Sequence, residues 1–419
     1  MQNLDLSKIK KVFFVGIGGI GISAIARMMF LEGKEVSGSD MAENELTHEL
    51  RDLGLHITID QSFELIPKDT DLIVYTIAIP HYDVNLFNQI KDSGILYKSY
   101  PEMLGIVTAD KYTIAVAGTH GKTTTTAMIA KILIDAGLDP TVVVGSLLKD
   151  YKSNLVVGLG KYFVVEACEY KRSFLNIKPK LAVITNIEED HLDYYKDLDD
   201  IKNAFNQFTS QSENVISDYS KYLEKVPKLS VPGVHNRKNA AAALAVSDFL
   251  KIDLGLAQKS LSEFSGTWRR LEKRGQTKDG TIVYDDYAHH PTEIMASIEA
   301  LREIYPQGGD GAKRITIVFQ PHLYSRTKAL FNDFAKSFKG VDDIILLPIY
   351  FAREEKDESV SSGKLVEAIC KDGDKAIAFT DFELAENYLK SVSFGKNDVF
   401  VTMGAGEAYK VADQVFKFV

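Results

Sequence analysis

One stretch of the chain, residues 112–126, constrains the fold more than any other. It reads YTIAVAGTHGKTTTT: an apolar, β-branched run at 113–117, a glycine-rich loop at 118–123 and the start of a helix-compatible segment, 124–136. A strand, such a loop and a helix form a cradle for phosphate, because loop N–H groups and the helix dipole both favour an anion there. We therefore predict an ATPase-type phosphate loop, shortened to GTxGKT because Val116 stands where the usual motif has its first glycine.

Within this loop, Lys122 is predicted to bind the β- and γ-phosphates of ATP, and the hydroxyl of Thr123 to bind Mg²⁺. The other residues of the predicted ATP-binding loop are Gly118, Thr119, His120, Gly121 and Thr124. The alternative is an ordinary strand-to-helix turn that happens to be rich in glycine. A GK[ST] triplet between a strand and a helix favours phosphate binding over that alternative.

A second glycine-rich loop, GIGGIG at 16–21, follows an apolar run at 11–15 and precedes a helix-compatible segment at 23–32. This is the Rossmann-type pattern for a diphosphate. The next predicted strand, 36–40, ends in Asp40, where a dinucleotide enzyme would place an acid on the ribose. The loop alone is weak evidence for NAD, because the same loop can hold any diphosphate.

Polar residues gather where the predicted strands of the central region end. Glu166 ends the strand 162–166, and the segment 187–193, which contains His191, follows the strand 181–186. Ligands of open α/β sheets bind at the carboxyl ends of the strands, so we expect these groups near Mg²⁺ and phosphate, with a solvated charged loop as the alternative. Asn236 and Asn239 begin an alanine-rich helix, where they either cap the helix or read a base edge.

The last part of the chain repeats this arrangement. Asp286 lies near the end of the predicted strand 282–287, His290 follows it, and His322 and Arg326 follow the strand 315–319. Two anion-binding loops and these side chains suit a site where an amine attacks an acyl phosphate. A kinase, an ATP-driven ligase and an NTPase switch remain open on these patterns alone.

Strands that alternate with helices predict the α/β class, with three consecutive domains built on largely parallel sheets. We place the domains at residues 1–107, 108–266 and 267–419. A chain of 419 residues is long enough for two or three domains, each with its own core. We see no repeat of fixed period and no low-complexity segment.

The composition indicates which environment and which classes of partner we expect for the protein. With 45% hydrophobic residues, no apolar run long enough for a bilayer and no evident signal peptide at its start, the chain is expected to be soluble, without a membrane partner. Two cysteines far apart imply no disulfide framework and fit the cytoplasm. A net charge of −9 argues against a nucleic-acid partner. We expect a monomer or a homodimer.

Taken in order, the motifs resemble those of the Mur ligase family, and most closely its L-alanine-adding members. The resemblance spans nearly the whole chain and rests on the segments GIGGIGISAIA (16–26), GTHGKTTTT (118–126), NIEEDHLDYY (186–195), HNRKNAAAAL (235–244), DDYAHHPTE (285–293) and FQPHLYSRT (319–327). It implies a Rossmann-like UDP-substrate domain, a central ATPase domain and a C-terminal Rossmann-like domain. It also implies that ATP phosphorylates the lactyl carboxylate of UDP-N-acetylmuramate, and that L-alanine then attacks the acyl phosphate.

The resemblance also implies roles for single residues. It assigns Thr123 and Glu166 to one Mg²⁺ and His191 to a second. Asn236 and Asn239 would contact the adenine, and Arg270 and Asp286 the phosphate and ribose. His290, His322 and Arg326 would face the reacting substrates. The backbone of Gly18, Gly19, Ile20 and Gly21 would bind the uridine diphosphate, with Asp40 near the uridine.

Three features depart from the family pattern. The acidic segment after the second central strand reads EACEYK here instead of EADESD, so Cys168 and Lys171 replace two acids. Leu323 stands where the family has an arginine before the tyrosine of its QPH motif. The chain is also short for this enzyme, which predicts trimmed loops.

Other interpretations stay open. A ligase that recycles murein tripeptide has a central segment that Tyr170 echoes, and a regulator with a degenerate ATPase is a non-catalytic alternative. A nicotinamide dehydrogenase would have no use for the second phosphate loop. Among single residues, His235 is alternatively a mere helix-start residue, Arg269 a surface charge and Tyr287 a core residue.

Overall fold

The computed structural model describes residues 4–309, 311–351, 354–371 and 373–419. Within these residues the strands form one five-stranded and two six-stranded sheets. The chain divides into two compact units. The first unit holds the five-stranded sheet and one six-stranded sheet, and consists of Met1–Glu188, Asp199–Tyr222 and Ala242–Ser260. The second holds the other six-stranded sheet, and consists of Glu189–Leu198, Leu223–Ala241 and Leu261–Val419.

The five-stranded sheet is parallel, with the strand order β3-β2-β1-β4-β5. Its strands are β1 (Lys11–Val15), β2 (Glu35–Asp40), β3 (His56–Ile59), β4 (Leu72–Tyr75) and β5 (Leu96–Ser99). Central β1 is apolar and buried from residue 12 to residue 15, as a strand covered on both faces must be. The strand order reverses at β1, which is where open α/β sheets bind ligands, and the loop 16–21 follows β1 there.

The helices of this region are α1 (Ile20–Leu31), α2 (Glu45–Asp52), α3 (Ile79–Tyr82), α4 (Val84–Asp92) and α5 (Tyr100–Thr108), with short 3₁₀ turns η1 (Leu6–Lys8) and η2 (Phe63–Leu65). A capping box defines the start of α5. The hydroxyl of Ser99 accepts from the backbone N–H of Glu102, and the Glu102 carboxylate accepts from the backbone N–H of Ser99 at 2.8 Å. Together these bonds fix the first turn of α5.

The six-stranded sheet of the first unit has the order β11-β10-β6-β9-β7-β8. Its strands are β6 (Tyr112–Ala117), β7 (Thr141–Leu148), β8 (Ser153–Val156), β9 (Tyr162–Glu166), β10 (Leu181–Ile184) and β11 (Asn214–Ile216). All neighbours are parallel except β8, which is antiparallel to β7. Strand β6 lies between β10 and β9, so the polar residues that follow these three strands meet at one edge of the sheet.

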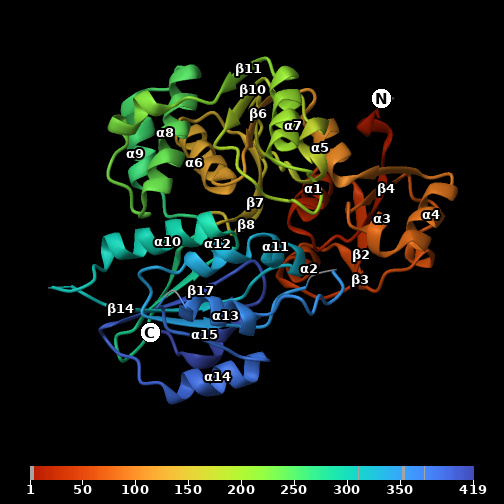
Figure 1. Ribbon diagram of the computed structural model, residues 1–419. Helices are drawn as coiled ribbons and strands as arrows, with labels where there is room; N and C mark the ends of the chain where they lie inside the picture. Colours follow the sequence, from red (N-terminus) through yellow and green to blue (C-terminus); the bar gives the residue numbers. More distant parts are fainter. Residues whose placement is uncertain (1–3, 310, 352–353, 372) are drawn as a thin grey trace. The chain divides into compact units, whose positions relative to one another are not determined.

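Helices α6 (Lys122–Asp135) and α7 (Leu198–Ser210) lie on opposite sides of this sheet (Figure 1). A 3₁₀ segment, η3 (Tyr170–Asn176), follows β9, and Phe174 within it stacks on Phe208 of α7 with ring centroids 4.7 Å apart. The remaining elements are η4 (Ser220–Lys225), α8 (Val234–Phe249) and α9 (Leu254–Ser262), and the division between the two units falls within each of them.

The sheet of the second unit has the order β12-β13-β17-β14-β15-β16. Its strands are β12 (Glu272–Gln276), β13 (Ile282–Asp286), β14 (Arg314–Phe319), β15 (Asp343–Leu346), β16 (Ala376–Ala378) and β17 (Asp398–Met403). Only β12 is antiparallel to its neighbour among these strands, all of which lie in the described residues.

Both faces of this sheet are covered, and alternate residues of each strand supply the two cores. Ile315, Ile317 and Phe319 of β14 pack on one face with residues of α10 (Pro291–Ile304), α12 (Phe331–Lys336) and α13 (Ser362–Lys371). Val318 packs on the other face with residues of α14 (Phe382–Ser391) and α15 (Tyr409–Val415). A short helix, α11 (Tyr324–Ala329), follows β14. Figure 1 shows α10 and α14 on opposite faces.

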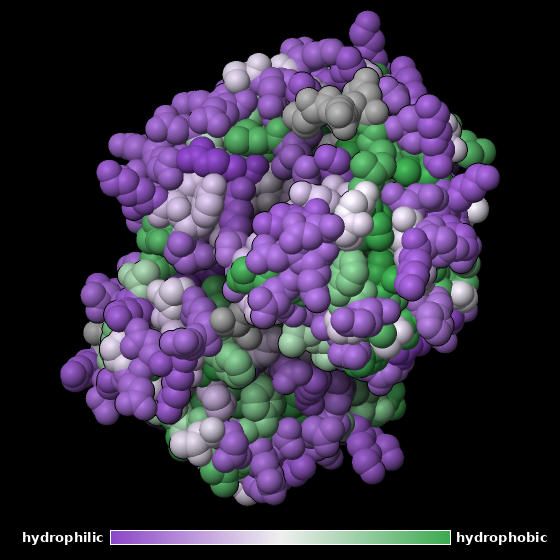
Figure 2. Space-filling model, turned by 90° about the vertical axis from the view of Figure 1, so that its right-hand side faces the viewer, coloured by the Kyte–Doolittle hydropathy of each residue, from purple (hydrophilic) through white to green (hydrophobic). Residues whose placement is uncertain are grey.

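The predicted α/β class with largely parallel sheets is confirmed. The predicted domain limits at 107 and 266 stay predictions. Hydrophilic residues cover most of the face seen in Figure 2, and hydrophobic residues show between them in small groups. In the part of the chain that the structure describes, no helix has the length and apolar character needed to cross a membrane.

Candidate functional site

The predicted phosphate loop connects β6 to α6 in the first unit. Gly118 and Gly121 have φ values of 147° and 80°, which side-chain-bearing residues rarely adopt. A Cβ on Gly118 would lie 1.9 Å from the hydroxyl oxygen of Thr185, so this position also lacks room for a side chain. No side chain caps the first turn of α6. The N–H groups of that turn therefore present the donors and the positive end of a helix dipole that a phosphate needs.

The side chain of Lys122 is folded over this loop. Its Nζ donates to the carbonyl oxygens of Gly118 at 2.6 Å and Thr119 at 3.0 Å, and to the carboxylate of Glu169 at 3.0 Å. Burial alone would lower the pKa of Lys122, but the neighbouring acidic groups, Glu169 first, outweigh burial and raise it. The ammonium is therefore charged at neutral pH, as a phosphate ligand must be.

Thr123 and Glu166 form the part of this site that suits a metal ion. The Thr123 hydroxyl donates to Oε2 of Glu166 at 2.9 Å, and the backbone N–H of Gly145 donates to the same oxygen at 2.8 Å. A hydroxyl and a carboxylate are hard oxygen ligands of the kind Mg²⁺ prefers, with phosphate oxygens and water completing the shell. Among the described residues, no three His, Cys, Asp or Glu side chains gather as a metal site. These residues thus fit Mg²⁺ held partly by nucleotide phosphates.

Residues after β10 hold the phosphate loop in place, and the sequence patterns did not single them out for this. The backbone N–H of Thr119 donates to the carbonyl oxygen of Asn186 at 3.1 Å, and that of His120 to Oδ1 of Asn186 at 2.8 Å. The Thr185 hydroxyl donates to the carbonyl oxygen of His120 at 2.6 Å. Nε2 of His120 also lies 3.6 Å from the carboxylate of Glu188. The sequence feature that could have identified these residues is that polar residues directly follow β10, the strand that pairs with β6.

The glycine-rich loop of the five-stranded sheet is built in the same way. The backbone N–H of Gly18 donates to Oδ2 of Asp40 at 2.8 Å, and Nδ2 of Asn44 donates to the carbonyl oxygen of Gly18 at 3.2 Å. Asp40 therefore shapes the loop directly. Gly19 is the N-cap residue of α1, without a side-chain cap, and Ile20 and Gly21 form its first turn. This leaves a second helix N-terminus suited to a diphosphate.

In the second unit, Arg326 and Asp190 form a buried ion pair. Nε and Nη2 of Arg326 both donate to Oδ1 of Asp190 at 3.2 Å, and Nη1 lies 3.3 Å from Nδ1 of His322. Nε2 of His191 lies 3.8 Å from Oδ2 of Asp190. Burial acts to raise the pKa of Asp190, but the electrostatic influence of His191 and then of Arg326 lowers it. A hollow of about 90 Å³ adjoins the pair, and its apolar wall consists of Leu192, Ala329 and Leu330.

Three further histidines surround this pair. Nδ1 of His290 accepts from the backbone N–H of Thr292 at 3.2 Å, and its Nε2 contacts the carbonyl oxygen of Glu189 at 3.2 Å, so the neutral ring carries its proton on Nε2. The rings of His289 and His322 are 5.9 Å apart. Burial lowers the pKa of His289 to about 4 and that of His322 to about 3, so both are neutral at neutral pH. His289 was not among the predicted site residues, although it adjoins His290.

Two of the residues expected to contact the nucleotide are asparagines buried in α8. Nδ2 of Asn236 donates to the carbonyl oxygen of Pro232 at 2.7 Å, and Nδ2 of Asn239 donates to Oδ1 of Asn236 at 3.3 Å. Burial lowers the pKa of the preceding His235 to about 4. The contact of these asparagines with adenine stays a prediction.

Arg270 and Asp286 lie in the second unit as well. The guanidinium of Arg270 lies 5.2 Å from the ring centroid of Tyr287, and its Nη1 lies 3.7 Å from Oε1 of Glu293. Asp286 is buried and accepts from the Ser297 hydroxyl and from the backbone N–H of Ala288. Burial raises the pKa of Asp286 to about 6.

Arg269 is not the surface charge that one interpretation expected. Its side chain is buried, with Nε 2.6 Å from Oδ2 of Asp285, and it donates to the carbonyl oxygens of Gly404 at 2.7 Å and Gly406 at 3.1 Å. Through these bonds, Arg269 ties the segment that precedes β12 to the loop after β17. Leu323, where the resemblance expected an arginine, has a φ of 70° and precedes α11.

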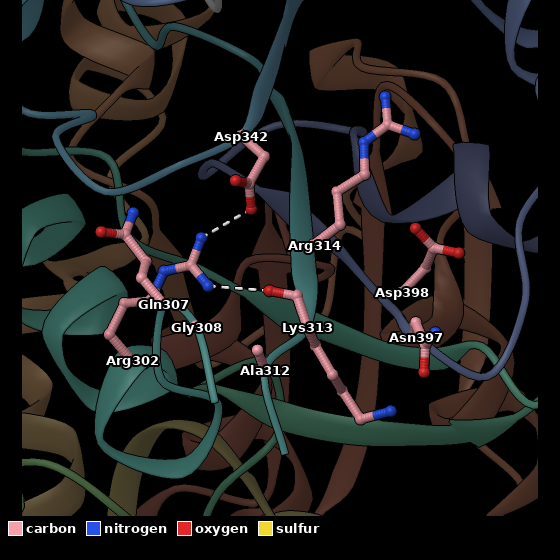
Figure 3. Close-up of a pocket in the computed structure, with 9 residues that line it drawn as sticks. All are labelled: Arg302, Gln307, Gly308, Ala312, Lys313, Arg314, Asp342, Asn397 and Asp398. Carbon is pink, nitrogen blue, oxygen red and sulfur yellow. Dashed lines mark hydrogen bonds and ion pairs between the residues drawn. The ribbon is translucent and has the colours of Figure 1, made fainter. Parts of the chain in front are cut away.

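A larger hollow, of about 480 Å³, lies at the amino ends of β14 and β17 (Figure 3). Arg302 lies in its wall. The guanidinium of Arg302 donates to the Asp342 carboxylate at 2.6 Å and to the carbonyl oxygen of Lys313 at 2.8 Å. Three basic and two acidic side chains line the hollow, and none of the predicted site residues does. Because the ligands of such sheets bind at the carboxyl ends, this hollow is not the candidate site.

Three domain families match the chain. They are "Mur ligase family, catalytic domain" at residues 11–112, "Mur ligase middle domain" at 116–218 and "Mur ligase, glutamate ligase domain" at 269–406. Among curated relatives, the UDP-N-acetylmuramate–L-alanine ligase of Clostridium kluyveri is 40% identical over 98% of this chain and 99% of the relative. The enzyme of the same name from Lachnospira eligens is 39% identical over the full length of both.

Solved structures agree with these matches. The UDP-N-acetylmuramate–alanine ligase of Thermotoga maritima superposes with a TM-score of 0.82 at 27% identity, over 97% of this chain and 98% of that one. A murein peptide ligase of Psychrobacter arcticus superposes with a TM-score of 0.69 at 21% identity over the same shares, which is a likeness of fold alone.

Proposed function

Because the chain belongs to the Mur ligase family, we propose that it is an ATP-dependent ligase that joins L-alanine to the lactyl carboxyl group of UDP-N-acetylmuramate. The observation that carries the proposal is the uncapped start of α6, where Lys122 and the Thr123–Glu166 pair meet. The choice of substrates rests on relatives of that name, which match this chain over nearly its whole length.

The reaction has two steps. A carboxylate oxygen of the nucleotide sugar attacks the γ-phosphorus of ATP, and ADP leaves. The amine of L-alanine then attacks the carbonyl carbon of the acyl phosphate, inorganic phosphate leaves and the nitrogen loses a proton. Charge develops on phosphate oxygens in the first step, so fixed positive groups at those oxygens lower the barrier.

Lys122 and the first turn of α6 supply those positive groups. The Lys122 ammonium moves from the carbonyl oxygens of Gly118 and Thr119 onto the β- and γ-phosphate oxygens. Glu169 keeps the ammonium charged while it is buried. The residues that would hold Mg²⁺ are Thr123 and Glu166, with His191 for a second ion. Bound there, Mg²⁺ would offset the negative charge that develops on the phosphate oxygens.

The acceptor half of the reaction is assigned to the cluster around Arg326. The guanidinium, oriented by Asp190, suits the carboxylate of an amino acid. His289 and His322 are neutral at neutral pH, so neither ring adds a positive charge beside Arg326. The apolar wall of the small hollow suits a short side chain such as that of alanine.

The setting follows from the substrates. Nucleotide sugars and ATP are cytoplasmic, so we place the enzyme in the cytoplasm, as a monomer or a homodimer. The product is an early precursor of peptidoglycan.

The test compares acceptors. Phosphate release from ATP and Mg²⁺ is measured with UDP-N-acetylmuramate and, as the acceptor, either L-alanine or the free tripeptide of the muramyl tripeptide. Turnover with L-alanine supports the proposal. Turnover with the tripeptide alone would assign the enzyme to murein recycling, which Tyr170 keeps as the second candidate. No turnover with either would leave the regulator as the interpretation to pursue.

A further inference from the structure

Tyr100 lies between the two anion-binding loops of the first unit and has no role in the account above. It is the first residue of α5, immediately after the N-cap Ser99. The capping box between Ser99 and Glu102 fixes this turn, so the backbone of Tyr100 is held by bonds on either side of it.

On one side, the phenol lies against the last glycine of the loop at 16–21. A Cβ built on Gly21 would lie 2.4 Å from Cζ and 2.5 Å from the hydroxyl oxygen of Tyr100. The hydroxyl end of the side chain therefore occupies the space next to the first turn of α1. That turn has no side-chain cap and is the proposed diphosphate site.

The phenol is also within electrostatic reach of the acidic segment that follows β9. Burial, and then the charges of Cys168 and Glu166, raise the pKa of Tyr100. The hydroxyl therefore keeps its proton at neutral pH and can donate it. Glu166 accepts from the Thr123 hydroxyl, so this second neighbour belongs to the phosphate loop.

The hydroxyl of Tyr100 has no hydrogen-bond partner among the described residues. Two other tyrosines of the same unit do have one: Tyr82 donates to Gln61 at 2.6 Å, and Tyr219 to the carbonyl oxygen of Thr185 at 2.7 Å. The Tyr100 side chain is partly buried and its hydroxyl is not enclosed, so this donor is open to a ligand that enters the space beside it.

We propose that the Tyr100 hydroxyl donates a hydrogen bond to the N-acetylmuramyl part of the nucleotide sugar. This inference rests on the proposed function, in which the diphosphate lies at Gly18–Gly21 and the lactyl carboxylate must reach the phosphate at Lys122. The sugar and its lactyl group then cross the space between the two loops, which is where the hydroxyl lies. Tyr100 is a substrate-binding residue in this arrangement and takes no part in proton transfer.

The test measures the binding of UDP-N-acetylmuramate and of UDP to the Tyr100→Phe variant. Titration calorimetry in the absence of ATP gives both affinities. Loss of one hydrogen bond should weaken binding of the nucleotide sugar about 5- to 10-fold. Binding of UDP, the KM for ATP and the unfolding temperature should stay unchanged. Tyr97→Phe is the matched control, because Tyr97 lies on β5 and packs against the ring of Tyr75; it should change neither affinity.

Two results would overturn the inference. Unchanged affinity of Tyr100→Phe for the nucleotide sugar would show that the hydroxyl makes no contact with it. An equal loss for UDP would place the contact on the uridine diphosphate instead. Failure of the wild-type protein to bind UDP-N-acetylmuramate would be a different outcome, since it would refute the proposed function and this inference with it.

Discussion

The guanidinium of Arg326 donates twice to one carboxylate oxygen of Asp190, at 3.2 Å from both Nε and Nη2, and their side chains are only 8% and 9% exposed. Asp190 lies in the segment that follows β10 in the sequence, and Arg326 lies in α11. One buried pair therefore ties two segments of the second unit that are far apart in the chain.

Asp190→Asn should destabilise the protein strongly. The substitution keeps the shape of the side chain but leaves the buried Arg326 charge uncompensated, which typically costs about 3–5 kcal/mol. Urea denaturation followed by circular dichroism measures the loss. Asp193→Asn is the control, because this side chain is exposed in the same segment and its loss should change stability by less than about 0.5 kcal/mol. Equal effects of the two variants would contradict a buried pair.

Lys122→Met should reduce ATP-dependent phosphate release by about 100- to 1000-fold, because a charge that stabilises the transition state is removed. Binding of UDP-N-acetylmuramate at the loop 16–21 should be nearly unaffected. Lys131→Met is the control on the same helix, where Lys131 pairs with Asp135 at 3.0 Å, and it should retain activity. If Lys122→Met loses affinity for both ATP and UDP-N-acetylmuramate, the two loops are misassigned.

Gly118→Ala should abolish ATP binding, because the new Cβ would lie 1.9 Å from the Thr185 hydroxyl at a φ of 147°. Gly137, which follows α6, has a φ of 70° but nothing within 4 Å of a Cβ. Gly137→Ala should therefore carry only backbone strain, about 1 kcal/mol, and keep ATP binding. Fluorescent nucleotide titration separates the two variants, and ATP binding by Gly118→Ala at wild-type affinity would refute the loop geometry.

Asp286→Asn should stabilise the protein at pH 7.5 and have little effect at pH 4. Burial raises the pKa of Asp286 from 3.8 to about 6 in the folded state. Protonated Asp286 thus contributes about 3 kcal/mol to the free energy of unfolding. This contribution is complete below pH 4 and is lost as the pH rises through about 6.

Unfolding measured at both pH values checks this prediction. Asp333→Asn, with an exposed side chain in α12, should show no such pH dependence. A stability difference between wild type and Asp286→Asn that stays the same at both pH values would contradict the raised pKa.

Strands buried on both faces could be predicted from the sequence, while edge strands could not. The predicted strands 11–15 and 162–166 have the same bounds in the structure, because each is a continuous apolar run between polar or glycine-rich ends. The edge strands β11 and β12 were not predicted, since Asn214–Ile216 is short and Glu272–Gln276 is mostly polar and charged. An edge strand needs no apolar run on both faces, so its sequence resembles that of a loop.

Only part of the candidate site could likewise be predicted from the sequence. Lys122 and Thr123 could be placed because their loop is contiguous in the chain. The support that Asn186 and Thr185 give to that loop could not, because it depends on β10 being the neighbour of β6. Arg269 was open to interpretation as a surface charge because its partners, Asp285, Gly404 and Gly406, come together only in the folded sheet.

Transfer of ¹⁸O from the substrate carboxylate to phosphate tests the central claim most directly. UDP-N-acetylmuramate labelled with ¹⁸O in its lactyl carboxylate is converted with ATP, Mg²⁺ and L-alanine, and the released phosphate is analysed by mass spectrometry. The account predicts one ¹⁸O in each phosphate, because the bridging oxygen of the acyl phosphate leaves with phosphorus when the amine attacks. Phosphate without label, at a rate independent of L-alanine, would contradict carboxyl activation by this enzyme.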